Sequence, residues 1–230
     1  IAEEIARFYG YNNIATTSVS GGAQGKYSPE QRFARTLNQS MLAMGMNEIL
    51  TYSFISPKYY DKILMPQDCE LRNSVTIRNP LGEDTSVMRT TAIPSMMEIL
   101  SKNYNNRNAT AYLYEICREY IPTEPDKLPI EKEVLIAGMY GDNADFFTAK
   151  GILEELLNKA GLQNYDIEAS SDEYTFHPGR CAVLSVEGER LGVLGEVHPQ
   201  CIENYGISTR VYMFKLDVAV LYKYANTEKS

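Results

Sequence analysis

Residues 79–120 constrain the fold more than any other part of the chain. The turn-forming run 79–82 (Asn-Pro-Leu-Gly) leads into a short strand-like segment that ends at Arg89. Apolar side chains at helical spacing follow over residues 93–104, and residues 112–120 then alternate as a strand does. Strands follow strands here without the regular βαβ alternation of a parallel sheet. This order favours an antiparallel α+β fold.

The rest of the chain shows the same mixture of elements. Ser28 and Gln31 have the spacing of a capping box, with Pro29 in the first turn, and they begin a helix that ends near Gly45. Residues 186–190 predict a hairpin turn. We expect further helices at 1–10, 57–64 and 148–160, and strands at 48–54, 76–78, 86–89, 134–140, 167–169, 181–186, 190–197 and 211–216.

The charge balance limits the partners of this chain. With 22 Lys and Arg against 30 Asp and Glu, the net charge is −8, whereas a surface that neutralises many phosphates is rich in Lys and Arg. We therefore expect no extensive nucleic-acid binding by this segment, and only localised contacts with phosphates stay possible. No apolar run of about 18 residues is present, so we expect no membrane span, and the acidic start lacks the basic region of a signal peptide.

The cysteines point to a reducing compartment. Cys69, Cys117, Cys181 and Cys201 lie far apart and form no C-x-x-C pair, whereas zinc sites cluster their ligands and disulfide scaffolds are dense in cysteine. We expect four independent buried or half-buried thiols in a cytoplasmic protein. The chain begins at Ile1, inside an apparent helix and without Met, which suggests a piece of a longer protein.

Two groups of charged residues are candidates for chemistry. The adjacent carboxylates of Glu3 and Glu4 could share a magnesium ion, although two carboxylates are an incomplete ligand set and a solvated helix face is the simpler interpretation. Arg89 lies in one predicted strand, and Glu115 and Arg118 lie in another. Because side chains alternate along a strand, Glu115 and Arg118 point to opposite faces and cannot line one pocket without a bulge. Structural hydrogen bonds or ion pairs are the alternative for this group.

The histidines and two glycines have plain structural interpretations. His177 and His198 both precede proline, which favours extended backbone at a turn. Two interpretations follow: a shared metal or acid–base site, or turn residues whose rings pack or hydrogen-bond locally. Gly192 and Gly195 lie inside a strand pattern, where glycine marks a bulge or close packing rather than a phosphate loop. The apolar stripe of the helix that begins after Ser28 includes two methionines, and it predicts either core packing or a subunit interface.

Several segments resemble one family in the same order along essentially the whole chain. This family is the β subunit of bacterial phenylalanine–tRNA ligase, and several motifs in order are far more specific than any one. The matching segments are 3–14, which resembles the end of the family's B5 domain, and 79–108, 113–116, 176–180, 192–199, 204–207 and 211–217, which resemble its class II-like core.

The resemblance implies a role in an enzyme rather than an active site. The family is an (αβ)₂ enzyme that charges tRNA(Phe) with phenylalanine using ATP and magnesium, and its α subunit holds the aminoacylation site. The β core is a class II aminoacyl-tRNA synthetase-like antiparallel sheet flanked by helices that has lost catalytic residues and packs against α. This sequence agrees, because Arg210 lacks the glycine pattern of the third class II motif. In class II synthetases, an Arg and a Glu on neighbouring strands hold the nucleotide.

The resemblance divides the chain into three parts. Residues 1–25 are the end of the B5 domain and a linker, residues 26–222 are the non-catalytic core, and residues 223–230 are a polar tail that leads to a C-terminal domain. The family implies magnesium binding by Glu3 and Glu4 in the full-length subunit, no catalytic or cofactor-binding residue in this chain, and no activity of this piece alone. The alternative is a free-standing class II-like ligand-binding or assembly domain.

Overall fold

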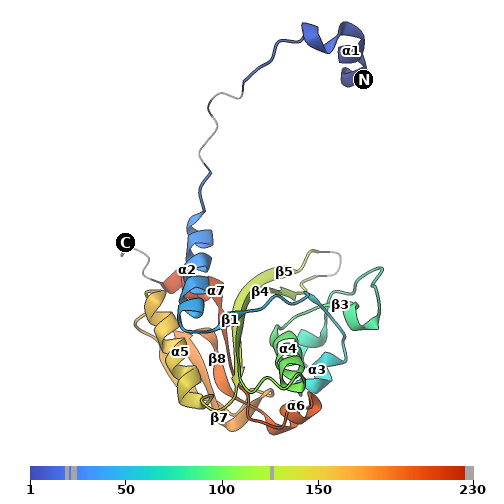
Figure 1. Cartoon of the computed structure of the whole chain (residues 1–230). Coiled ribbons are helices and arrows are strands. Elements are labelled where there is room, and N and C mark those ends of the chain that lie inside the picture. Colours follow the sequence, from blue (N-terminus) through green and yellow to red (C-terminus); the bar gives the residue numbers. More distant parts are fainter. Residues whose placement is uncertain (19–20, 22–24, 125–126, 226–230) are drawn as a thin grey trace.

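A seven-stranded sheet forms the centre of the structure, a computed structural model that describes all residues except 19–20, 22–24, 125–126 and 226–230. The strand order is β1-β4-β5-β9-β8-β7-β6, and neighbouring strands are antiparallel except for the pair β1 and β4 (Figure 1). A separate two-stranded sheet pairs β2 with β3. The strands are β1 Asn47–Glu48, β2 Phe54–Ile55, β3 Val87–Met88, β4 Ala111–Ile121, β5 Ile130–Tyr140, β6 Asp166–Ala169, β7 Phe176–Val186, β8 Glu189–Val197 and β9 Tyr212–Asp217.

Helices cover both faces of the large sheet. Figure 1 shows α2, α5 and α7 on one face and α3, α4 and α6 on the other, and a separate apolar core lies under each group. The antiparallel α+β architecture expected from the sequence is therefore confirmed. The helices are α1 Ala2–Tyr9, α2 Pro29–Ala43, α3 Tyr59–Lys62, α4 Ile93–Asn105, α5 Phe146–Lys159, α6 Pro199–Asn204 and α7 Val218–Tyr224, with 3₁₀ turns at Tyr11–Asn13, Glu70–Arg72 and Glu83–Thr85.

Strand β4 shows how one strand serves both layers. Leu113 and Cys117 belong to the core under α4, whereas Tyr114 belongs to the core under α2 and α5. The same alternation places Met213 and Phe214 of β9 in opposite cores, both fully buried. Each such side chain stabilises the fold by about 1.5–3 kcal/mol relative to leaving it exposed.

Helix α2 begins as its sequence predicts and buries its apolar stripe inside the chain. The Ser28 hydroxyl accepts from the Gln31 N–H at 3.2 Å, and the Gln31 side chain accepts from the Ser28 N–H at 2.9 Å, which completes the capping box. Leu37 and Met41 are fully buried against the sheet and its neighbouring helices. Core packing is therefore confirmed for Met41, which is too deeply buried to contact a partner subunit, whereas Met44 is half-buried.

Segment 48–54, expected to be one strand, is divided between the two sheets. Its start, β1, pairs with β4, and its end, β2, pairs with β3. Between them the Thr51 N–H donates to the Glu115 carboxylate at 2.7 Å rather than to a strand carbonyl, which interrupts the ladder. The strand expected at 76–78 is reduced to an isolated bridge between Thr76 and Val87.

The helices α6 and α7 have no counterpart among the predicted elements. Pro199 occupies the first turn of α6, and the Asp217 carboxylate caps α7 by accepting from the Ala219 and Val220 N–H groups. Because α7 continues to Tyr224, the chain is helical beyond the predicted start of the polar tail at 223. Both helices are seven residues or shorter, which is too short for a clear apolar period.

Parts of the sequence predictions lie outside the described residues. These are the centre of the linker, at 19–20 and 22–24, and the tail from 226 onward. In the part of the chain that is described, we find no helix long and apolar enough to span a membrane.

The predicted hairpin turn between β7 and β8 is confirmed, with Glu187 at φ 50° and Gly188 at φ 81°, the positive angles that a tight type I′ turn requires.

Candidate functional site: the buried Arg89–Glu115 network

Arg89 follows β3 and is fixed between two segments that are distant in sequence. Its N–H donates to the Ser53 carbonyl at 2.9 Å, and its own carbonyl accepts from the Tyr120 N–H at 2.9 Å. The backbone of Arg89 therefore joins the extended segment before β2 to strand β4. The side chain is consequently held over the sheet, and only 1% of the residue is exposed.

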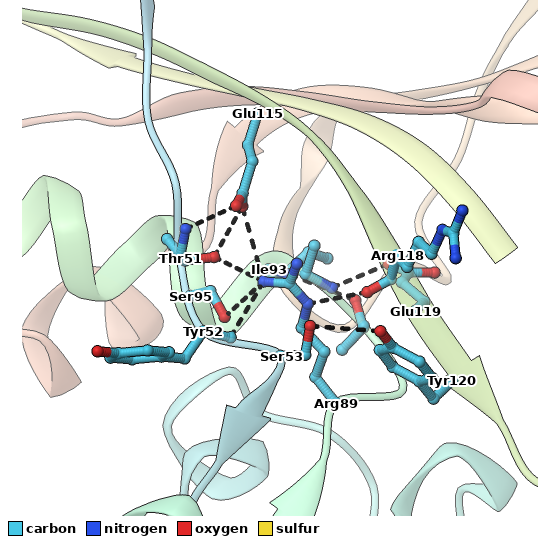
Figure 2. A network of polar contacts seen from close by, with 12 residues as sticks. Thr51, Tyr52, Ser53, Arg89, Ile93, Ser95, Glu115, Arg118, Glu119 and Tyr120 are labelled. Atoms are coloured by element: carbon cyan, nitrogen blue, oxygen red, sulfur yellow. Dashed lines mark hydrogen bonds and ion pairs between the residues drawn. The ribbon is translucent and has the colours of Figure 1, made fainter. Parts of the chain in front are cut away.

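The Arg89 guanidinium donates to groups within the protein (Figure 2). Nε donates to the Arg118 carbonyl at 3.0 Å, and Nη1 donates to the Thr51 hydroxyl at 2.6 Å. Nη1 also lies 3.1 Å from the Ser95 hydroxyl and 3.5 Å from the Tyr52 carbonyl. A buried guanidinium must be paired and hydrogen-bonded, and these four acceptors from three segments meet that requirement.

Glu115 completes the network from strand β4. Its carboxylate accepts from both the N–H and the hydroxyl of Thr51, each at 2.7 Å, and Oε2 lies 3.6 Å from Arg89 Nη1. Only 2% of Glu115 is exposed. Thr51 is thus bonded to both charges at once, and the pair holds the extended segment 49–53 against the sheet (Figure 2).

Arg118 takes no part with its side chain. It points to the opposite face of β4, where it is 57% exposed and forms an ion pair with Glu131 of β5. The prediction that Glu115 and Arg118 cannot line one pocket is confirmed, because β4 pairs with β5 in register without a bulge. The alternative of structural hydrogen bonds and ion pairs is the correct one for both residues.

A second buried carboxylate, that of Glu119, escaped the sequence analysis. Glu119 is 3% exposed, and its Oε1 accepts from the Ala92 N–H at the start of α4 at 2.9 Å and from Lys215 Nζ at 2.8 Å. The available signal was its position, because Glu119 lies four residues after Glu115 and therefore on the same face of the strand. Glu119 lines a cavity of about 520 Å³ over the sheet.

The remaining candidates are separate from this network. Glu4 is exposed and pairs with Arg7 at 2.7 Å, and the described residues contain no cluster of three or more side chains that could hold a metal. His177 Nδ1 accepts from the Gly179 N–H at 3.0 Å, and His198 Nδ1 accepts from the Gln200 N–H at 3.1 Å. The prediction of local turn hydrogen bonds is confirmed for both histidines.

Arg210 and the strand glycines also have structural roles. Arg210 Nε lies 3.8 Å from the buried Glu196 carboxylate, which also accepts two bonds of 2.9 Å from Arg180. A Cβ at Gly192 would lie 2.2 Å from the Lys215 carbonyl of the neighbouring strand. Close packing, one of the two expected reasons for a glycine in a strand, is therefore confirmed there.

The thiols are buried rather than reactive. Burial raises the pKa of Cys117, Cys181 and Cys201 to about 12, so these thiols are neutral at physiological pH, and Cys69 is half-buried. A hollow of about 1470 Å³ lies by α2, α5 and α7. The charged residues that line it are all exposed, which is unlike a preorganised site. They are Arg32, Lys159, Asp166 and Glu187.

Comparison with solved structures identifies the fold. Two structures of pyrrolysyl-tRNA synthetase from Desulfitobacterium hafniense match with TM-scores of 0.67 and 0.65. The first is 14% identical and covers 84% of this chain and 68% of the other, and the second is 13% identical and covers 83% and 64%. At this identity the likeness shows the fold alone, which is that of a class II-like synthetase sheet.

The family model for the phenylalanyl-tRNA synthetase beta chain CLM domain matches residues 14–218. The chain belongs to this family. Relatives named phenylalanine–tRNA ligase beta subunit include that of Clostridium tetani, 45% identical over 100% of this chain, and that of Clostridium acetobutylicum, 46% identical over 96%. The chain covers only 29% and 28% of these relatives.

Membership of the phenylalanyl-tRNA synthetase beta chain family gives the Arg89–Glu115 pair its context. The CLM domain is a class II-like domain of the β subunit, and the antiparallel sheet that carries Glu115 in this chain agrees with that description. Both side chains are turned inward and bonded to Thr51. Arg89 and Glu115 therefore hold the segments of the CLM domain together.

Proposed function

We propose that this chain is the non-catalytic, class II-like core of a phenylalanine–tRNA ligase β subunit. In this role it supports the ATP-dependent charging of tRNA(Phe) with phenylalanine by a separate α subunit, within an (αβ)₂ assembly in the cytoplasm. The observation that carries the proposal is the inward-facing Arg89–Glu115 pair, whose side chains hydrogen-bond to Thr51, Ser95 and the Arg118 carbonyl. A side chain that catalyses a reaction must reach the substrate, and these are 1% and 2% exposed.

A row of exposed apolar side chains supports the role in assembly. Leu50, Tyr52 and Phe54 alternate along the extended segment that leads into β2, and they are 87%, 79% and 42% exposed. Tyrosine, phenylalanine and leucine on a rigid backbone suit the dry centre of a protein interface. The Arg89–Glu115 pair fixes this backbone from behind, through Thr51 and the Ser53 carbonyl. We place the contact with the α subunit on this row, rather than on the methionine face of α2.

The domain boundaries and the metal site remain proposals for the longer subunit. We assign residues 1–25 to the end of the B5 domain and its linker, residues 26–222 to the core, and the residues from 223 to the connection with a C-terminal domain. The apolar stripe of α1, with Ile5 64% and Phe8 82% exposed, supports packing against further parts of a B5 domain.

ATP and magnesium belong to the whole enzyme in this proposal, and none is expected to bind the core. Glu3 and Glu4 do not by themselves fit a magnesium ion, because Glu4 is paired with Arg7 and an octahedral shell needs further oxygen ligands. Their role in metal binding is therefore proposed only for the full-length subunit, where other residues would complete the site.

The proposal predicts no phenylalanine activation by the 230-residue chain. Pyrophosphate exchange with ATP and phenylalanine should stay at the level of a blank, and calorimetry with the two substrates should give no heat of binding. Exchange should appear when the cognate α subunit and the rest of β are supplied. Exchange by the isolated chain would instead favour a free-standing class II-like ligand-binding domain.

A further inference from the structure

The cavity beside Glu119 has the size and the lining of a small-molecule site. It measures about 520 Å³ and lies between the start of α4 and strands β8 and β9, within the range of about 300–1,000 Å³ that is usual for such sites. Ile93, Val134 and Val193 supply apolar walls, and Glu119 and Lys215 supply charge. Neither the Arg89 side chain nor the row Leu50, Tyr52 and Phe54 lines this cavity, so it is separate from the network described above.

The carboxylate of Glu119 is buried and only half used. Both bonds that the described residues make to it, from the Ala92 N–H and from Lys215 Nζ, go to Oε1. No described residue donates to Oε2, although a carboxylate oxygen accepts up to two hydrogen bonds. Because Glu119 is 3% exposed and lines the cavity, a donor that reaches Oε2 must come from a molecule inside it.

The residues that line the cavity include one more carboxylate than cationic side chains. Each of its three cations is already paired with a carboxylate, and Asp172 is a fourth carboxylate without a cation among the described ion pairs. The three pairs are Lys215 with Glu119 at 2.8 Å, Arg190 with Glu173 at 2.8 Å, and Lys132 with Asp217 at 2.9 Å.

A metal ion does not match this arrangement, but an organic ammonium does. No group of three or more metal-binding side chains occurs in the described part of the chain. We propose that the cavity binds a small primary amine or diamine, with one ammonium donating to Glu119 Oε2 and a positive end toward Asp172. The carbon chain of such a molecule would lie against the apolar walls, and Tyr174 also lines the cavity.

The ring of Tyr174 suits this occupant. Burial raises the pKa of the Tyr174 phenol, so the group is neutral at physiological pH and adds no charge to the cavity. A neutral aromatic ring attracts an ammonium by about 0.5–2 kcal/mol, depending on its exposure to water. An anion would gain nothing comparable, because Lys132, Arg190 and Lys215 already have carboxylate partners.

Calorimetry with three four-carbon probes tests the proposal on the 230-residue chain at physiological salt. 1,4-Diaminobutane should bind, whereas 1,4-butanediol, of the same length but neutral, and succinate, of opposite charge, should not. Glu119→Gln should weaken diamine binding by at least about tenfold, the loss of one charge-assisted hydrogen bond. Asp172→Asn, at an exposed position that leaves the core intact, should weaken it by about two- to fivefold.

A matched control separates this site from general attraction to an acidic protein. Asp142→Asn removes the same charge at an exposed turn between β5 and α5, outside the cavity, and should leave the affinity unchanged. The proposal is overturned if the diamine does not bind, if succinate binds as well, or if Asp142→Asn and Asp172→Asn have equal effects. If Glu119→Gln unfolds the chain, the comparison of Asp172→Asn with Asp142→Asn still decides.

Discussion

Tyr52→Glu is expected to weaken binding of the cognate α subunit by about 30-fold or more. Tyr52 is 79% exposed and stands in the middle of the apolar row, between Leu50 and Phe54. Aromatic residues at the dry centre of an interface each contribute about 2 kcal/mol or more, and a buried, unpaired carboxylate adds a desolvation cost. The affinity would be measured by calorimetry between the two purified subunits, with Leu50→Glu as a second variant of the row.

Phe147→Glu is the matched control for this prediction. Phe147 is 78% exposed, as Tyr52 is, but it lies at the start of α5 on the other face of the sheet. Its substitution should change the affinity less than about twofold, since surface changes away from an interface are nearly neutral. Equal losses from Phe147→Glu and Tyr52→Glu would contradict the proposed docking row, as would full affinity of Tyr52→Glu.

Arg89→Met should lower the free energy of unfolding by about 3–5 kcal/mol. The substitution keeps an apolar stem but leaves Glu115 buried without its cationic partner, and removal of one member of a buried pair costs this much. It also removes the bonds that Arg89 donates to Thr51 and Ser95. Urea denaturation followed by circular dichroism would measure the change.

Two further variants make the Arg89 prediction specific. Arg118→Met removes the same charge from the next strand, but Arg118 is 57% exposed, so the expected loss is under about 1 kcal/mol. The double variant Arg89→Met with Glu115→Gln should lose less than the sum of its single variants, because no uncompensated charge is left buried. Equal losses for Arg89→Met and Arg118→Met would show that burial of the pair does not stabilise the fold.

Local patterns in the sequence predicted the parts of the site that depend on one element. The alternation of β4 predicted that Glu115 and Arg118 face opposite sides, and the Ser28–Gln31 spacing predicted the start of α2. These features need only the geometry of one strand or one helix turn. The sequence resemblance added the class II-like architecture, which the seven-stranded sheet confirms.

The rest of the site depends on contacts between distant segments. Thr51 meets Glu115 across 64 positions and Arg89 across 38, and no local period records either contact. The same contacts interrupt the strand expected at 48–54. The apolar stripe of α2 predicted a buried face but could not show whether Met41 packs inside the chain or against a partner. Only the assembled fold separates these cases.

The most direct test of the structural role is Glu115→Gln in the assembled enzyme, with full-length β and α subunits. If Glu115 only holds Thr51 and Arg89 in place, the turnover number for phenylalanine activation should stay within about twofold of the unmodified enzyme, while the denaturation midpoint of the β subunit falls. A loss of about 10²–10³ in turnover, with folding and assembly intact, is typical for removal of a group that stabilises a transition state. That result would contradict the account and place Glu115 in the chemistry.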